Sequence, residues 1–144
     1  MAKPLTLEDR AAIEDRLGRY AWELDTGNIA GVVACFTPDG VTLDTQGNRK
    51  DPLAFAHDFI TRPDFRGRQH QVTHLFFDGD DERCVVTSYW TVFRWQFKAE
   101  KREVASVGYS KDTMAKRNGK WLIAERALYW LTDEHGPWFG PKTP

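Results

Sequence analysis

The sequence is poor in the features that would place it in a specialised class of protein. Its 144 residues include two cysteines, Cys35 and Cys84, which are too few for a disulfide scaffold and have no companions that would indicate metal or redox chemistry. No apolar run resembles a signal peptide or could span a bilayer, so we expect a cytoplasmic protein with no membrane partner. Because 20 Lys and Arg balance 21 Asp and Glu, nothing in the charge indicates a nucleic-acid partner.

Motifs for common kinds of chemistry are lacking too. The chain has no nucleophile elbow and no phosphate-binding glycine loop. Aromatic residues, by contrast, are abundant: six Trp, four Tyr and nine Phe exceed what the core of a modest domain needs. We therefore expect some of them to line a cavity or a subunit interface. The length fits one domain, 1–144, with an irregular tail from about residue 132.

The N-terminal part of the chain has helical patterns. Thr6 and Asp9 predict the start of a long first helix that ends at Gly27. Its buried stripe is predicted to consist of Ile13, Leu17, Tyr20, Ala21 and Leu24. Asn28 can cap a short second helix that carries Val32, Val33 and Phe36.

A turn, a brief strand and a third helix come next. Thr37-Pro38-Asp39-Gly40 predicts the turn, and residues 41–43 alternate as in a strand. Asp51-Pro52 predicts the start of the third helix, since a capping carboxylate and a first-turn proline occupy their favoured places. Its buried side would be Phe55, Ala56, Phe59 and Ile60.

The second half of the chain has strand patterns rich in Val, Thr, Tyr, Phe and Trp. Four strands are predicted, at 69–77, 84–97, 103–116 and 120–131. Because the connections between them are short, the strands should form an antiparallel meander. Helices followed by such a sheet make an α+β fold, in which a curved, cone-shaped sheet wraps around the first helix and leaves a pocket at one end.

Two residues stand out as candidates for chemistry, Asp25 and His70. The helical period that defines the buried stripe carries Asp25 toward the interior, although a carboxylate in the last turn opposes the helix dipole. The alternative is a solvated turn residue that bonds nearby backbone amides. His70 opens the first long strand, where a carboxylate beside it would fix its tautomer and raise its basicity; the alternative is a hydrogen-bonded structural histidine.

Further residues are candidates for binding a ligand. Strand alternation predicts that His74 shares a face with His70, along with Val72 and Phe76. The two histidines are about 13 Å apart on a strand, at roughly 3.3 Å per residue, so we expect no metal site and no cofactor. The predicted substrate-binding residues are Tyr20, His74, Trp90, Phe55 and Phe59.

Motifs spread over positions 7 to 130 share a pattern with one known family. The first set is Arg10-Ala11-Ala12-Ile13-Glu14-Asp15, Tyr20-Ala21, Asp25-Thr26-Gly27, Phe36 and Asp39-Gly40-Val41. The second set is Gln69-His70-Gln71-Val72-Thr73-His74, Asp78-Gly79-Asp80, Gly108-Tyr109, Asp112, Gly119, Trp121 and Arg126. Together they resemble the SnoaL-like proteins of the nuclear transport factor 2-like superfamily. The resemblance implies a cone of curved sheet with three helices, assembled as a homo-oligomer (dimer or trimer), and an Asp25–His70 base dyad like that of the family's dehydratases and dehydrochlorinases.

Two functions follow from this interpretation. The first is a cofactor-independent lyase, such as a dehydratase, or an isomerase acting on a hydrophobic cyclic or aromatic small molecule. In it His70 would abstract a proton, Asp25 would orient His70, and Tyr20 or His74 would polarise an oxygen. The second is a non-catalytic ligand-binding protein, or a small subunit that packs on an aromatic-ring oxygenase partner.

Overall fold

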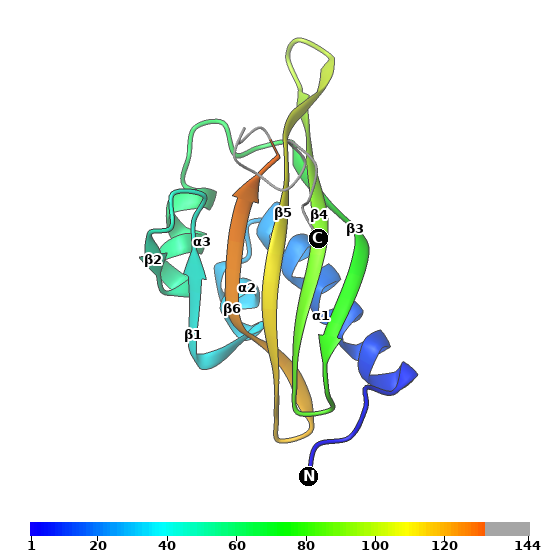
Figure 1. Ribbon diagram of the computed structural model, residues 1–144. Helices are drawn as coiled ribbons and strands as arrows, with labels where there is room; N and C mark the ends of the chain where they lie inside the picture. The colour runs from blue at the N-terminus through cyan, green and yellow to red at the C-terminus, as the bar shows by residue number, and fades with distance from the viewer. Residues whose placement is uncertain (132–144) are drawn as a thin grey trace.

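A computed structural model describes residues 1–131 of the chain, so the predicted tail from about residue 132 lies outside the described residues. One six-stranded sheet, in the order β2-β1-β6-β5-β4-β3, curves around the long helix α1 (Leu7–Asp25). Two shorter helices, α2 (Ile29–Ala34) and α3 (Pro52–Ile60), pack together beside α1 (Figure 1). The predicted α+β class, with a curved sheet wrapped around an N-terminal helix, is confirmed.

Helix α1 forms where its caps and apolar stripe predict it. Thr6 and Asp9 make a reciprocal capping box, in which each side chain accepts a hydrogen bond from the other residue's backbone N–H. The predicted stripe is buried in full, with side chains between 0 and 7% exposed: Ile13, Leu17, Tyr20, Ala21 and Leu24. Burial of this face against the sheet, rather than helix propensity, is what holds α1 in place.

The prediction for Phe36 is wrong. It is the first residue of strand β1 (Phe36–Leu43) rather than part of the second helix, and it pairs with Ile123 of strand β6 (Lys120–Trp130). The predicted turn at 37–40 is a bulge within β1, since the pairing with β6 resumes at Val41. Tertiary contacts outweigh the local pattern here, because the Phe36 ring packs edge-on against the Tyr20 ring at 5.8 Å.

The four long strands of the meander are confirmed with small shifts at their ends. They are β3 (Arg68–Gly79), β4 (Arg83–Gln96), β5 (Lys101–Arg117) and β6, and each pairs antiparallel with the next. Asn118 and Gly119 connect β5 to β6 with φ values of 50° and 76°, as a two-residue hairpin turn requires. Strand β1 adds to β6 in parallel and the short β2 (Arg49–Lys50) pairs with β1, so within residues 1–131 the sheet stays open at β2 and β3.

Of the helices within residues 1–131, none combines the length and the apolar character needed to cross a bilayer.

A buried carboxylate, that of Asp9, connects the start of α1 to strands β5 and β6 beside the turn that joins them. Asp9 Oδ1 accepts hydrogen bonds from Trp121 Nε1 and Lys116 Nζ, both at 2.9 Å. These two donors hold the pKa of Asp9 well below its usual range, although burial acts in the opposite direction. The ionised carboxylate therefore stabilises the folded chain above the ordinary pKa of 3.8, and this contribution is lost as the pH falls toward the lower pKa of the folded state.

We expect Asp9→Asn to lower the free energy of unfolding at neutral pH by about 2 kcal/mol, a typical loss for hydrogen bonds to a charged group. An Asn amide nitrogen would face N–H or O–H donors whichever way the side chain turned. The measurement is urea unfolding followed by circular dichroism, and the difference from wild type should shrink below pH 4. Asp15→Asn, at an exposed position on the same helix, should leave the stability unchanged. Equal stability of Asp9→Asn and wild type at pH 7 would contradict this role.

Candidate functional site

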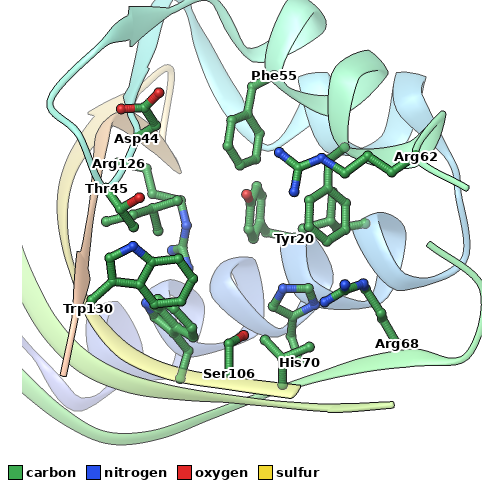
Figure 2. Close-up of a pocket in the computed structure, with 15 residues that line it drawn as sticks. Tyr20, Asp44, Thr45, Phe55, Arg62, Arg68, His70, Ser106, Arg126 and Trp130 are labelled. Atoms are coloured by element: carbon green, nitrogen blue, oxygen red, sulfur yellow. The ribbon is translucent and has the colours of Figure 1, made fainter. Parts of the chain in front are cut away.

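A cavity of about 160 Å³ opens between α1, α3 and the curved sheet (Figure 2). This volume is close to that of an engineered protein cavity of about 150 Å³ that binds benzene, so it can take a small ring system. Aromatic and aliphatic side chains make up much of its wall, and polar groups converge from several elements. Its lining consists of Tyr20, Leu24, Asp44, Thr45, Phe55, Phe59, Arg62, Arg68, His70, Trp90, Val92, Ser106, Arg126, Leu128 and Trp130.

Asp25 is bonded to His70, which lines one wall of this cavity, although Asp25 itself is not among the lining residues. Asp25 is the last residue of α1, and its Oδ1 lies 2.5 Å from Nδ1 of His70 on β3. Its Oδ2 accepts a hydrogen bond of 2.8 Å from the backbone N–H of His70. Because an ionised carboxylate only accepts hydrogen bonds, we assign the proton of the neutral ring to Nδ1. The Nε2 atom keeps its lone pair, and His70 contributes to the cavity wall.

The surroundings of Asp25 explain how a carboxylate is tolerated at the negative end of a helix. Both side chains of the pair are 14% exposed, so the charge is largely withdrawn from water. Two N–H donors from β3 replace the water, and they offset the unfavourable helix dipole. Asp25 is thus bound to a neighbouring strand, as its helical period predicts, whereas the alternative was a solvated turn residue. Its role in a reaction, like that of His70, stays a prediction.

Tyr20 lies above a buried ion pair that connects β5 and β6. Arg126 Nη1 donates to both carboxylate oxygens of Asp112, at 2.8 and 2.7 Å, and its Cζ lies 4.5 Å from the centre of the Tyr20 ring. Burial is the largest single effect on Arg126 and lowers its pKa, but the Asp112 carboxylate and Tyr20 together outweigh burial and raise the pKa of Arg126 above its ordinary value. Burial also raises the pKa of Tyr20 to about 12, against a smaller opposing effect of Arg126. The Tyr20 hydroxyl, which points into the cavity in Figure 2, is therefore a neutral hydrogen-bond donor at physiological pH.

The three other aromatic residues in the predicted binding set also line the cavity. Phe55 and Phe59 extend from α3, with their rings stacked at 6.4 Å, and Trp90 contributes an indole from β4. The Phe59 ring centre lies 5.5 Å from that of His70. Phe59 therefore packs against the imidazole and covers it from the side of α3. Both Phe residues are half-buried rather than buried, because they form a cavity wall instead of core.

The prediction for His74 is wrong. His74 has a φ of 56°, and a β-bulge between Thr73 and Phe76 reverses which side chains face inward. Before the bulge His70 and Val72 face inward; after it Leu75 and Phe77 do, and they pack against the core. His74 is exposed on the outer face, where its ring lies 5.4 Å from that of Tyr89, so it does not line the cavity.

The structure also shows how far the side chains that could bind a metal ion lie from one another. Within residues 1–131, no three side chains of His, Cys, Asp or Glu converge as a metal site would require. The bulge also directs His70 and His74 to opposite faces of β3, so the two imidazoles cannot bind one ion together.

Several lining residues were missed by the sequence analysis. Ser106 on β5 and Trp130 on β6 share the inner face with the buried pair, and a strict alternation count back from Asp112 would have found Ser106. Arg62 belongs to the connection between α3 and β3, where the sequence has no periodic signal, and Arg68 is the first residue of β3. Arg68 is held by Asp64, with Nη2 at 2.6 Å from Oδ2.

Comparisons with known proteins agree with this geometry. The family model for the SnoaL-like domain matches residues 5–127. The fold is similar to that of a protein of unknown function with a cystatin-like fold from Nostoc punctiforme, at 23% identity over 90% of this chain and 96% of that chain, with a TM-score of 0.79. ActVI-ORFA from Streptomyces coelicolor is 21% identical over 85% of this chain and 96% of that chain, with a TM-score of 0.74.

A third similar structure is an NTF2-like protein with a cystatin-like fold from Novosphingobium aromaticivorans, at 18% identity over 88% of this chain and 84% of that chain, with a TM-score of 0.77. At these identities the structural matches establish the fold. No curated protein matched the sequence significantly. The family match and the lined cavity together support a small-molecule-binding or catalytic role. With most of its length covered by the family model, the chain belongs to the SnoaL-like family.

Proposed function

We propose that this protein is a cofactor-independent lyase or isomerase that removes a carbon-bound proton from a small hydrophobic cyclic or aromatic molecule. The observation that carries the proposal is the Asp25–His70 contact of 2.5 Å at the wall of an aromatic-lined cavity. A base held by a carboxylate beside an apolar cavity suits the abstraction of a weakly acidic proton. Both side chains of the pair are only 14% exposed, and this low exposure strengthens the interaction between them.

Each polar group has a role in this scheme. Nε2 of His70 accepts the proton, and Asp25 stabilises the imidazolium that forms. The electron pair of the broken C–H bond becomes an enolate, whose oxygen accepts a hydrogen bond from the Tyr20 hydroxyl. The pair then forms a C=C bond as a hydroxyl on the adjacent carbon takes the proton from His70 and leaves as water, or the pair takes that proton back from His70 at another carbon. The first course is a dehydration and the second an isomerisation.

We expect wild type to accelerate the exchange of activated C–H protons for deuterium in bicyclic ketones such as 2-tetralone in D₂O, followed by NMR. His70→Gln, which removes the base, should reduce the acceleration by roughly 10²- to 10⁴-fold, the usual contribution of general-base catalysis, and Asp25→Asn, which removes the carboxylate that orients the imidazole, should reduce it as well. Asp15→Asn, on the exposed face of α1, is the control that should keep the wild-type rate. If His70→Gln and wild type exchanged protons at the same rate, the dyad would not be the base.

For Tyr20→Phe we expect exchange to slow by roughly tenfold or more, because one donor to the developing enolate is lost. The variant keeps the ring that packs against Phe36 and Arg126. Since the pKa of Tyr20 is about 12, the phenol stays protonated and the ratio of wild-type to variant rates should be constant from pH 7 to pH 10. A ratio that fell through pH 10 would instead indicate a phenol with an ordinary pKa.

A second proposal is that the chain assembles with further copies of itself, or in the non-catalytic alternative with a larger oxygenase partner. The hairpin between β4 and β5 projects beyond the body of the protein (Figure 1). Trp95 and Phe97 on it are 40% and 74% exposed, and their rings contact each other at 4.8 Å. Exposed aromatic clusters of this kind favour protein contacts.

We expect light scattering during gel filtration to give the mass of a dimer or trimer for wild type. Phe97→Asp should shift the protein toward a monomer, because a charge would replace the most exposed ring of the hairpin. Lys98→Glu alters the neighbouring charge without removing apolar surface and serves as the control. A monomeric wild type would leave the self-assembly proposal without support.

A further inference from the structure

Within the described part of the chain, residues 1–131, three of the charged side chains that line the cavity have polar partners and one has none. Arg126 is paired with Asp112, and Arg68 with Asp64. The Asp44 carboxylate accepts hydrogen bonds from the backbone N–H groups of Gln46 and Asn48 at 2.9 and 2.8 Å, within its own loop. These three charges are satisfied before any ligand binds.

Arg62 is the exception. Among residues 1–131 no carboxylate lies within 4.0 Å of its guanidinium. Its side chain nevertheless has one ordered contact: the Cζ atom lies 5.5 Å from the centre of the Phe59 ring, in a cation–π interaction. In Figure 2 the guanidinium extends into the cavity between Phe55 and Tyr20.

The backbone around Arg62 also holds it toward the cavity. Arg62 follows the C-cap of α3, and its N–H donates to the Phe59 carbonyl at 3.3 Å. Its carbonyl accepts a hydrogen bond of 3.1 Å from Phe65. A planar fork of N–H donors is thus placed at the cavity wall, with no carboxylate partner among residues 1–131.

We propose that the ligand is an aromatic or cyclic carboxylic acid, whose carboxylate binds Arg62 while its ring lies against Phe55 and Phe59. Arg and a carboxylate form paired, charge-assisted hydrogen bonds, and the Phe55 and Phe59 rings line the cavity beside Arg62. The place of the reacting carbon beside His70 rests on the proposed function, whereas the binding of the carboxylate needs no reaction. In a bound substrate of this class, the charged carboxylate lies at Arg62 and the acidic C–H bond faces His70.

The test compares 2-naphthoate with 2-naphthamide, which share ring and shape but differ in charge. Their dissociation constants are measured by isothermal titration calorimetry on the full chain. We expect wild type to bind 2-naphthoate roughly tenfold more tightly than the amide, since one charge-assisted pair is gained. Arg62→Gln should remove this preference by weakening naphthoate binding alone, and Arg62→Lys should keep part of it.

Arg66→Gln is the matched control. Arg66 is exposed in the same connection and does not line the cavity, so this variant should keep the wild-type preference. Unchanged binding of the amide to Arg62→Gln shows that the cavity is still folded. The inference is overturned if wild type binds both compounds equally or neither, or if Arg62→Gln keeps the preference. Loss of proton exchange with an intact preference for naphthoate would instead count against the proposed function alone.

Discussion

The contact between Asp25 and His70 fixes the relation between the helix and the sheet, and the rest of the site depends on it. One carboxylate oxygen holds the backbone of His70 and the other holds its ring. The end of α1, the start of β3 and the plane of the imidazole are therefore set by a single side chain. Because that side chain is mostly withdrawn from water, its two bonds cannot be exchanged for hydration without cost. The same carboxylate thus positions the end of α1 and orients the imidazole of His70.

The charged side chains of the site differ in their pairing according to how deeply they are buried. At the bottom, Arg126 and Asp112 are paired, since an isolated charge buried there would be strongly unfavourable. At the entrance, Arg62 is exposed and has no carboxylate partner among residues 1–131, which is tolerated because water screens its charge. Tyr20, which is as buried as Arg126 and contacts it, is a neutral donor. A ligand that displaced water from the entrance would change the environment of Arg62 far more than that of the buried pair.

Local sequence patterns were sufficient for much of this architecture and insufficient for some of it. The helical period buried Tyr20 and directed Asp25 toward β3, and strand composition located the four long strands within a few residues. Phe36 was misassigned because its strand is defined by pairing with Ile123, far away in the chain. His74 was misassigned because a bulge has no signal in the period of two on which the prediction relied. The convergence of Arg62 on the cavity depends on how α3 packs, which no local pattern records.

Because of the bulge at His74, the two halves of β3 contribute inward-facing side chains to different parts of the structure. It shifts the phase of the strand by half a period, so that the first half presents His70 to the cavity and the second half presents Phe77 to the core. A change of one residue in the length of this bulge would cancel the shift and exchange inner and outer side chains in one half of the strand. A change of two residues would preserve both faces. The segment is therefore expected to vary in length among related chains only in even steps.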